Sequence, residues 1–373
     1  MSAAPLPERL ARVLRHDVQG MHAYAVQPSA GYVKLDAMEN PHRLPEPLQA
    51  ELGRRLGAVA LNRYPGARID ELRVALARHA RMAAGCALML GNGSDELISL
   101  LAMACDVPPE QSADGRAATV LAPVPGFVMY EMSARLQGLR FVGVPLTADF
   151  ELDAEAMLAA VRAHRPALTY IAYPNNPTAN LWDDGAIERI VEAVRDNGRG
   201  FVVFDEAYQP FAARSWMQRV ANHEHVLVMR TLSKFGLAGV RLGYLIGPEA
   251  LVAEIDKVRP PYNVSVLNCE AALFALEHED EFARQAQVLR AERARLVAAL
   301  RGLPGTTPFP SEANMVLVRV PDAAAAFEGL KARGVLVKNV SGLHPLLAGC
   351  LRLTVGLPEE NDQMIAALRG ILS

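Results

Sequence analysis

The sequence predicts an α/β protein in two parts: a large domain whose mostly parallel sheet is covered by helices, and a smaller α+β domain. Between residues 94 and 247, near-continuous apolar runs alternate with amphipathic runs of helical spacing, the pattern of a parallel sheet buried on both faces. After about residue 300 the runs follow the order strand, helix, strand, strand, helix, which is typical of a smaller α+β unit. A chain of 373 residues is also long enough for about two domains.

The elements of the large domain follow from the spacing of their apolar residues. Apolar residues three and four positions apart predict helices, and short apolar runs bounded by turn residues predict strands. Helices are expected at 94–105, 130–138, 153–164 and 183–198, and strands at 117–123, 139–146, 167–174, 201–206, 225–233 and 241–247.

The second part begins with a long helical region, expected from about Val264 to Leu300. The proline-rich segment 1–45 has little periodicity, so we expect it to pack onto one of the two parts rather than fold alone. The large domain is placed at residues 46–270, and the remaining part is built from residues 1–45 and 271–373. Its further elements are expected as strands at 314–320, 335–340 and 350–356, and as helices at 323–334 and from about Pro358.

Composition and charge exclude several classes of function. The net charge of −3 gives no sign of a nucleic-acid partner, and no uncharged apolar stretch is long enough to span a membrane. The N-terminal run MSAAPLPERLARVLRHDV acquires charges too soon for a signal peptide. The four cysteines form no CxxC pair, so reduced thiols in a cytoplasmic protein are expected. His223 and His225 precede a strand and fit a surface or capping role better than a metal site, so no metal is expected.

One lysine stands in an unusual setting. The run TLSKFGLAGVRLGY places Lys234 among small and apolar residues, and Arg241 follows seven positions later. The chain has five lysines and 33 arginines, a bias that a GC-rich genome would also produce. Lysine can lose its proton and form a Schiff base with a carbonyl group, whereas arginine cannot. Lys234 is therefore either a solvated surface charge or a reactive amine.

Further polar clusters follow the strands of the predicted sheet or precede one of its helices. PNNPT at 174–178 follows one strand, Asp205 ends another with Tyr208 three residues on, and Ser233 and Lys234 end a third. GNGSDE at 91–96 precedes a helix and offers free N–H groups for a phosphate, with Ser94 as a possible cap. Because ligands of open parallel sheets bind beyond the carboxyl ends of the strands, these clusters are expected to share one site.

Each cluster also has a purely structural interpretation. Asp205 could cap a helix, the two sequence motifs could be simple turns, Phe127 could belong to the core, and Arg241 could be a surface charge. One cofactor would explain them together. Pyridoxal phosphate needs an amine for its aldehyde, a carboxylate for its ring nitrogen, donors for its ring hydroxyl, and a cationic site rich in N–H groups for its phosphate.

The ordered series YPNNPT, FDEAY and TLSK resembles the fold-type I pyridoxal-phosphate-dependent aminotransferases of class I/II, and the resemblance covers nearly the whole chain. It implies three catalytic residues: Lys234, which holds the cofactor aldehyde, Asp205, which pairs with the ring nitrogen, and Tyr208. The further cofactor contacts that it implies are Asn176 with Tyr208 at the ring hydroxyl, Phe127 stacked on the ring, and Ser94, Asp95, Ser233 and Arg241 at the phosphate.

Within the family, the segments YVKLDAMENPH, LNRYPG, PGFVMY and CLRLTVGLPEEN resemble the enzymes that transaminate histidinol phosphate. The first motif departs from those relatives, because Met38 replaces an asparagine and His42 replaces a tyrosine. Tyr64 resembles a tyrosine that reaches the cofactor phosphate of a partner subunit, which implies a homodimer whose active site is completed by the neighbouring chain. The substrate contacts implied by the resemblance are Tyr24, Asn40, Arg352 and Lys338, where some relatives have a second arginine.

The resemblance thus implies transamination of L-histidinol phosphate with 2-oxoglutarate, giving imidazole acetol phosphate and glutamate in histidine biosynthesis. Three alternatives stay open: an aminotransferase for aromatic or other amino acids, a decarboxylase or lyase of the same fold, and a ligand-sensing regulator. The regulator is the weakest of these, because the short N-terminal segment leaves no room for a helix-turn-helix.

Overall fold

A computed structural model describes residues 6–21, 27–107, 111, 115 and 117–372. The chain forms two compact units, one up to Gly31 and one from Tyr32 onward. The first unit contains the helices α1 (Leu6–Val13) and α2 (His16–Gln19). All of the elements described below belong to the second unit.

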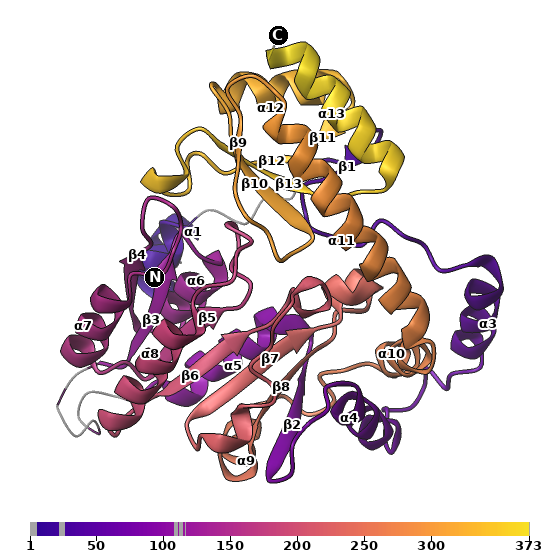
Figure 1. Ribbon diagram of the computed structural model, residues 1–373. Helices are drawn as coiled ribbons and strands as arrows, with labels where there is room; N and C mark the ends of the chain where they lie inside the picture. Colours follow the sequence, from indigo (N-terminus) through magenta and orange to yellow (C-terminus); the bar gives the residue numbers. More distant parts are fainter. Residues whose placement is uncertain (1–5, 22–26, 108–110, 112–114, 116, 373) are drawn as a thin grey trace. The chain divides into compact units, whose positions relative to one another are not determined.

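The second unit contains a seven-stranded sheet with the strand order β2-β8-β7-β6-β5-β3-β4 (Figure 1). The five strands from β7 to β4 in this order pair in parallel, whereas β8 runs antiparallel to both of its neighbours. The predicted mostly parallel sheet is therefore confirmed, with β8 as the reversed strand. The strands are β2 (Cys86–Gly91), β3 (Thr119–Val124), β4 (Arg140–Pro145), β5 (Leu168–Ala172), β6 (Phe201–Asp205), β7 (Val226–Thr231) and β8 (Gly243–Pro248).

Helices cover both faces of this sheet because its strands are apolar on both sides. Neighbouring residues of β5 show the alternation: Tyr170 packs into one core cluster and Ile171 into the other. The helices on the Tyr170 side are α5 (Gly93–Cys105), α6 (Val128–Leu136) and α9 (Glu249–Asp256); those on the Ile171 side are α4 (Arg68–His79), α7 (Ala154–His164), α8 (Asp184–Asp196) and α10 (Val266–Glu277).

A second, antiparallel sheet has the strand order β12-β13-β10-β9, and β1 pairs in parallel with β11 in a separate two-stranded ladder. A core of its own lies beneath these strands and includes Leu296, Leu353 and Leu368. The elements are β1 (Val33–Lys34), β9 (Thr307–Pro308), β10 (Met315–Arg319), β11 (Val335–Leu336), β12 (Lys338–Asn339), β13 (Cys350–Thr354), α11 (Glu279–Arg301), α12 (Ala323–Ala332) and α13 (Pro358–Leu372).

The structure corrects several predicted elements. The helical region expected at 264–300 is two helices, because α10 ends before His278 and α11 begins after it. The strand expected at 335–340 divides into β11 and β12, which pair with different partners. The helices and strands that the sequence pattern did not indicate are β1, β2, β9, α1, α2, α4, α9 and α3 (Glu46–Gly57). Helix α3 buries none of its residues, although Leu48, Leu52 and Leu56 recur at helical spacing along it.

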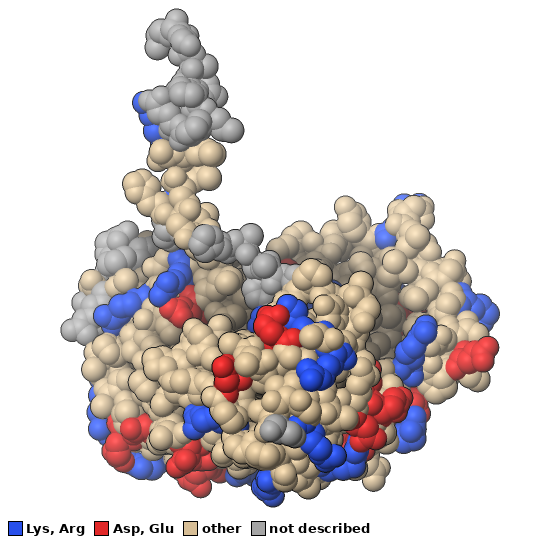
Figure 2. All heavy atoms as spheres, turned by 90° about the horizontal axis from the view of Figure 1, so that it is seen from above, with Lys and Arg blue, Asp and Glu red and all other residues tan. Residues whose placement is uncertain are grey.

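The division at residues 46–270 remains a prediction. Among the described helices, none has the length and apolar character that a membrane span requires. On the face shown in Figure 2, basic and acidic residues are interspersed rather than gathered by sign.

Candidate active site

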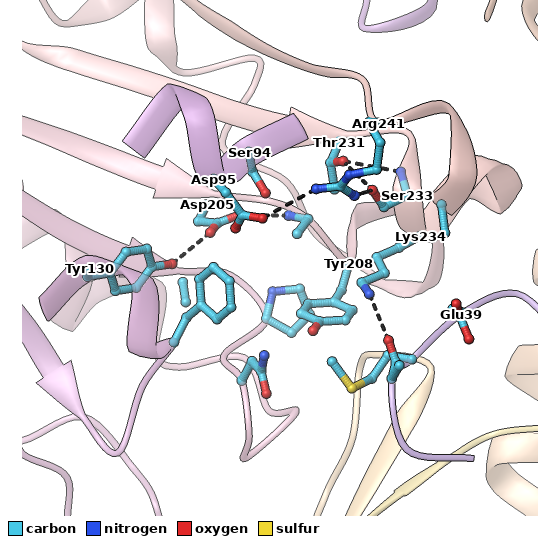
Figure 3. A pocket seen from close by; sticks show the side chains of 18 of the residues that line it. Glu39, Ser94, Asp95, Tyr130, Asp205, Tyr208, Thr231, Ser233, Lys234 and Arg241 are labelled. Atoms are coloured by element: carbon cyan, nitrogen blue, oxygen red, sulfur yellow. Dashed lines mark hydrogen bonds and ion pairs between the residues drawn. The ribbon is translucent and has the colours of Figure 1, made fainter. Parts of the chain in front are cut away.

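Three parallel strands end at one cavity of about 350 Å³. The last residues of β5, β6 and β7, namely Ala172, Asp205 and Thr231, all lie in its wall. The loop at 37–39 contributes a further part of the wall (Figure 3). The structure brings together here nine residues that the sequence singled out: Ser94, Asp95, Phe127, Asn176, Asp205, Tyr208, Ser233, Lys234 and Arg241.

Lys234 presents its amine to this cavity from the turn after β7. The turn runs over Ser233–Leu237 and contains Gly236 at φ +143°, a conformation that suits only glycine. The Lys234 Nζ donates a hydrogen bond to the Ala37 carbonyl at 3.0 Å. Burial, together with the positive charges of Arg352 and Arg241, lowers the pKa of Lys234 to about 8, against the opposing effect of Glu39 and Asp95. A substantial fraction of the amine is therefore neutral near physiological pH.

Asp205 ends β6 with its carboxylate almost completely buried. Oδ2 accepts a hydrogen bond from the Tyr130 hydroxyl at 2.7 Å, and Oδ1 accepts one from the Ala207 N–H at 3.1 Å. Burial raises the pKa of Asp205 to about 6, although these two hydrogen bonds act to lower it. A cation that entered the cavity beside this carboxylate would relieve the cost of burying its charge.

Another part of the cavity is suited to an anion. Ser94 and Asp95 lie in the first turn of α5, whose N–H groups are free for a ligand. Arg241 donates to the Ser233 Oγ at 3.3 Å and to the Asp95 Oδ2 at 3.3 Å. Gly93 has φ +79°, and a Cβ added there would lie 2.8 Å from the Arg241 Nη2. Because Gly93 has no side chain, the Arg241 guanidinium has space to approach the N-terminus of α5.

Two details of this part of the cavity differ from the sequence-based expectation. Ser94 does not cap α5, since Asn92 precedes the helix and its N–H donates to the Glu96 carboxylate at 2.6 Å. The Asp95 carboxylate is paired with Arg241. A carboxylate repels phosphate, so what Asp95 offers to an anion is the backbone of the helix turn together with the orientation of Arg241.

The middle of the cavity holds the remaining predicted contacts. Asn176 accepts a hydrogen bond at its Oδ1 from the Arg352 Nη1 at 2.8 Å. Tyr208 is buried, which raises its pKa above the ordinary tyrosine value, and its ring lies 5.9 Å from the Lys234 Nζ. Phe127 stands at the start of α6 with its side chain in the wall.

Several residues of the wall were missing from the predicted site, among them Tyr130, Thr231 and Met38. Tyr130 and Thr231 line the cavity, and the Thr231 hydroxyl donates to the Ser233 Oγ at 3.0 Å. Tyr130 follows Phe127 by three positions, which places both on one side of a helix start; that spacing was a usable signal. Met38 also lines the cavity, with φ +53°. The asparagine usual at this position in relatives tolerates that conformation better than methionine does.

Three of the predicted substrate contacts, Asn40, Lys338 and Arg352, lie outside the wall of this cavity. Arg352 on β13 bonds to Asn176 and to the Asp36 carbonyl, and Lys338 on β12 is its direct partner in the strand register. The Asn40 amide donates to the Gln285 Oε1 at 2.9 Å and to the Phe235 carbonyl at 3.4 Å, which occupies it in holding two segments together. These substrate roles therefore remain predictions.

Two further predicted contacts are tyrosines: Tyr64, expected at the cofactor phosphate of a partner subunit, and Tyr24, expected at the substrate. Tyr64 is 74% exposed and stacks on Tyr262 with 4.1 Å between the ring centroids. It does not line the cavity of its own chain. Tyr24 lies outside the described residues.

The sequence pattern of the family described as aminotransferase class I and II matches residues 31–368, which is most of the chain. The chain belongs to the class I and II aminotransferases. A histidinol-phosphate aminotransferase of Methylibium petroleiphilum is 83% identical to this aminotransferase over 99% of the chain and 97% of the relative. Another, from Polaromonas naphthalenivorans, is 66% identical over 97% of each.

A solved structure supports the fold of this aminotransferase. The histidinol-phosphate aminotransferase of Sinorhizobium meliloti, in complex with pyridoxal 5′-phosphate, superposes with a TM-score of 0.82 at 24% identity, over 96% of this chain and 97% of that one. At this identity the likeness concerns the fold alone.

Pyridoxal 5′-phosphate is the cofactor of this aminotransferase. The residues of the cavity fit it. A buried carboxylate at one end suits a protonated ring nitrogen, an amine with a lowered pKa suits an aldehyde, and the Gly93 cradle beside Arg241 suits a phosphate.

Proposed function

We propose that this aminotransferase transfers the amino group of L-histidinol phosphate to 2-oxoglutarate, giving imidazole acetol phosphate and glutamate. The observation that carries the choice of donor is the pair of cations on the antiparallel strands β12 and β13. Lys338 lies directly opposite Arg352 in the register, and residues directly opposite each other project from the same face. Two neighbouring cations suit a doubly charged phosphate, and the 83% identical relative has the same named activity.

Each catalytic residue has a distinct task in this proposal. Lys234 would hold the cofactor aldehyde through its Nζ. Once the substrate amine takes its place there, the freed Lys234 amine would take up the proton that leaves the substrate α-carbon and return it to the cofactor. Asp205 keeps the ring nitrogen protonated by a charge-assisted hydrogen bond. Tyr208 and Asn176 donate to the ring hydroxyl. When bound, pyridoxal phosphate supplies the electron sink for the carbanion formed at the α-carbon.

The phosphate of the cofactor is proposed to lie between Arg241, Ser233 and the first turn of α5. Phe127 covers one face of the ring from the start of α6. This arrangement fixes the ring between its two charged ends, so that the Lys234 amine meets the reacting carbon in one orientation.

The donor can be tested with purified enzyme, L-histidinol phosphate and L-phenylalanine. Each is mixed with the loaded enzyme without an acceptor, and the visible absorbance of the cofactor is followed through the half-reaction. We expect histidinol phosphate to bleach the absorbance at far lower concentration than phenylalanine. Bleaching by phenylalanine alone would favour the aromatic aminotransferase alternative, and CO₂ release without an acceptor would favour the decarboxylase.

A lysine variant tests the proposed phosphate contact. Lys338→Met is expected to raise the KM for histidinol phosphate about 10–100-fold, because a hydrogen bond to a charged group is lost. Dephosphorylated L-histidinol should bind both enzymes equally. Lys331→Met serves as the matched control, since Lys331 lies on α12 and pairs with Glu328 on the same helix. An unchanged KM in Lys338→Met would remove Lys338 from the substrate site.

A homodimer is also proposed, with Tyr64 completing the neighbouring active site. The exposed stack of Tyr64 and Tyr262 supports it, since large apolar side chains exposed together often mark an interface. Leu61, three residues before Tyr64, is 69% exposed in the same connection.

The reduced, buried thiols of Cys105 and Cys350 are in keeping with a cytoplasmic enzyme.

A further inference from the structure

Tyr130 contacts the Asp205 carboxylate from the wall of the cavity. It lies in α6, is 3% exposed, and donates its hydroxyl hydrogen to the Asp205 Oδ2 at 2.7 Å (Figure 3). The other carboxylate oxygen accepts the Ala207 N–H. Both oxygens of Asp205 therefore have a donor from the protein, and one of the two donors is a side chain.

The position of the Tyr130 hydroxyl is fixed by its ring. The ring stacks on Tyr170 at 4.3 Å with 8° between the planes, and it meets Phe127 edge to face at 5.6 Å and 86°. The stacked contact with Tyr170 and the edge-to-face contact with Phe127 together limit how far the Tyr130 ring can shift or tilt. Tyr130 thereby connects Phe127, which lines the cavity, with the carboxylate that faces the cofactor ring.

Other charged groups around Asp205 make its ionised form harder to keep. Asp95 and Glu206 both act on the carboxylate with negative charge, and burial acts in the same direction. Glu206 is itself neutralised by an ion pair with Arg230 at 2.8 Å. The groups that favour the ionised carboxylate are Tyr130 and the Ala207 N–H. Among side chains, Tyr130 thus makes the stabilising contact.

We propose that Tyr130 is a positioning residue, whose hydroxyl holds the Asp205 carboxylate ionised and oriented toward the ring nitrogen of pyridoxal phosphate. The inference rests on the proposed role of Asp205. Tyr130 does not touch the reacting atoms in this account, and it acts through Asp205.

The chain offers a matched pair of variants. Tyr130→Phe keeps the ring and removes the hydroxyl that bonds to Asp205. Tyr170→Phe removes a buried hydroxyl that has no hydrogen-bond partner among the described residues and lies outside the cavity wall. Both changes delete one oxygen from the same aromatic stack, so packing is altered equally and only one variant loses a donor to Asp205.

The test measures the cofactor rather than turnover. We expect Tyr130→Phe to raise the Kd for pyridoxal phosphate about 10–100-fold, the loss for one hydrogen bond to a charged group. With ¹⁵N-labelled cofactor, the ring-nitrogen signal should move from the protonated toward the unprotonated position. Tyr170→Phe should match the parent in both measurements. If Tyr130→Phe also matches the parent in both, Tyr130 only packs and the inference is wrong.

Two Asp205 variants separate this inference from the function on which it rests. Asp205→Ala should weaken cofactor binding and shift the ring-nitrogen signal whether or not Tyr130 matters. If Asp205→Ala changes neither, the assigned role of Asp205 fails, and the inference fails with it. In an Asp205→Asn background, adding Tyr130→Phe should cost much less affinity than it does in the parent, since the charged partner is gone. Full additivity of the two changes would contradict the inference.

Discussion

The surroundings of Lys234 change its acid–base chemistry. An ordinary lysine is charged at neutral pH, whereas burial and two nearby arginines lower the pKa of this one to about 8. The sequence indicated the residue through the motif TLSK and its apolar setting. It could not indicate the pKa, because Arg352 lies 118 positions further along the chain and reaches the site only through the fold.

The lowered pKa predicts how fast the cofactor attaches. In cofactor-free enzyme, the rate of covalent attachment of pyridoxal phosphate should rise about tenfold per pH unit below pH 8, because the neutral amine is the nucleophile. Above about pH 8 the rate should level off. Stopped-flow absorbance measures it directly. A rate that kept rising toward pH 10 would mean that Lys234 titrates as an ordinary lysine.

The pKa of Asp205 is raised rather than lowered, and this predicts how the stability of the cofactor-free protein depends on pH. Its folded pKa of about 6 lies above the ordinary 3.8, so its ionisation costs stability in the cofactor-free protein. The contribution is most favourable below about pH 4 and is lost as the pH rises through about 6. Asp205→Asn should therefore raise the free energy of unfolding by about 2–3 kcal/mol at pH 8.

The pH series provides the control for that variant. The gain from Asp205→Asn should be level near pH 8 and shrink as the pH falls through about 6 toward about 4, as measured by urea unfolding of cofactor-free protein. A gain that stayed constant across this range would show that it comes from packing rather than from ionisation.

At the scale of single elements, the sequence predicted long periodic segments well and short ones poorly. Helix α7 was expected at 153–164 and spans Ala154–His164. The break at His278 was missed because α10 and α11 both continue an apolar-polar pattern on either side of it. The division of 335–340 depends on two different partners, β1, which is far away in sequence, and β13, which follows closely, and no local pattern reveals this change of partner.

The turn between β2 and α5 yields a prediction at this scale. Gly93→Ala should weaken the binding of pyridoxal phosphate about 10–100-fold, because the new Cβ would displace Arg241 from the helix terminus. The Kd is measured by absorbance titration, together with urea unfolding of each variant.

Gly85 is the matched control for Gly93. It has φ +78° beside the +79° of Gly93, but an added Cβ there would meet nothing within 4 Å. Both alanine variants should lose about 1 kcal/mol of stability from the backbone conformation. Only Gly93→Ala should lose cofactor affinity, and equal affinity losses would show that strain, rather than the cradle, is responsible.

For the whole molecule, the order of the motifs predicted the site because a parallel sheet gathers strand ends at one edge. Asp205 and Thr231 end adjacent strands, so residues 26 positions apart become neighbours. Tyr64 could not be placed in the same way. Its role depends on a second copy of the chain, and within one chain it stands 74% exposed.

The proposed dimer can be tested by mixing two inactive enzymes. Lys234→Ala and Tyr64→Ala should each be strongly impaired, whereas dimers that contain one chain of each would hold one complete site. After unfolding and refolding the two together, about a quarter of the parental activity should return, because half of the dimers are mixed and one of their two sites is intact. Activity no greater than the average of the two variants would show that Tyr64 serves its own chain or none.

The hydrogen bond from the Lys234 Nζ to the Ala37 carbonyl links two segments that lie almost two hundred positions apart in the sequence. An amine that has condensed with an aldehyde keeps fewer hydrogens to donate. Covalent attachment of the cofactor should therefore weaken the hydrogen bond between Lys234 and Ala37. Deuterium uptake by the backbone amides around Ala37 should therefore depend on whether pyridoxal phosphate is bound. In the cofactor-free protein this uptake should be slower than the exposure of the loop alone would suggest.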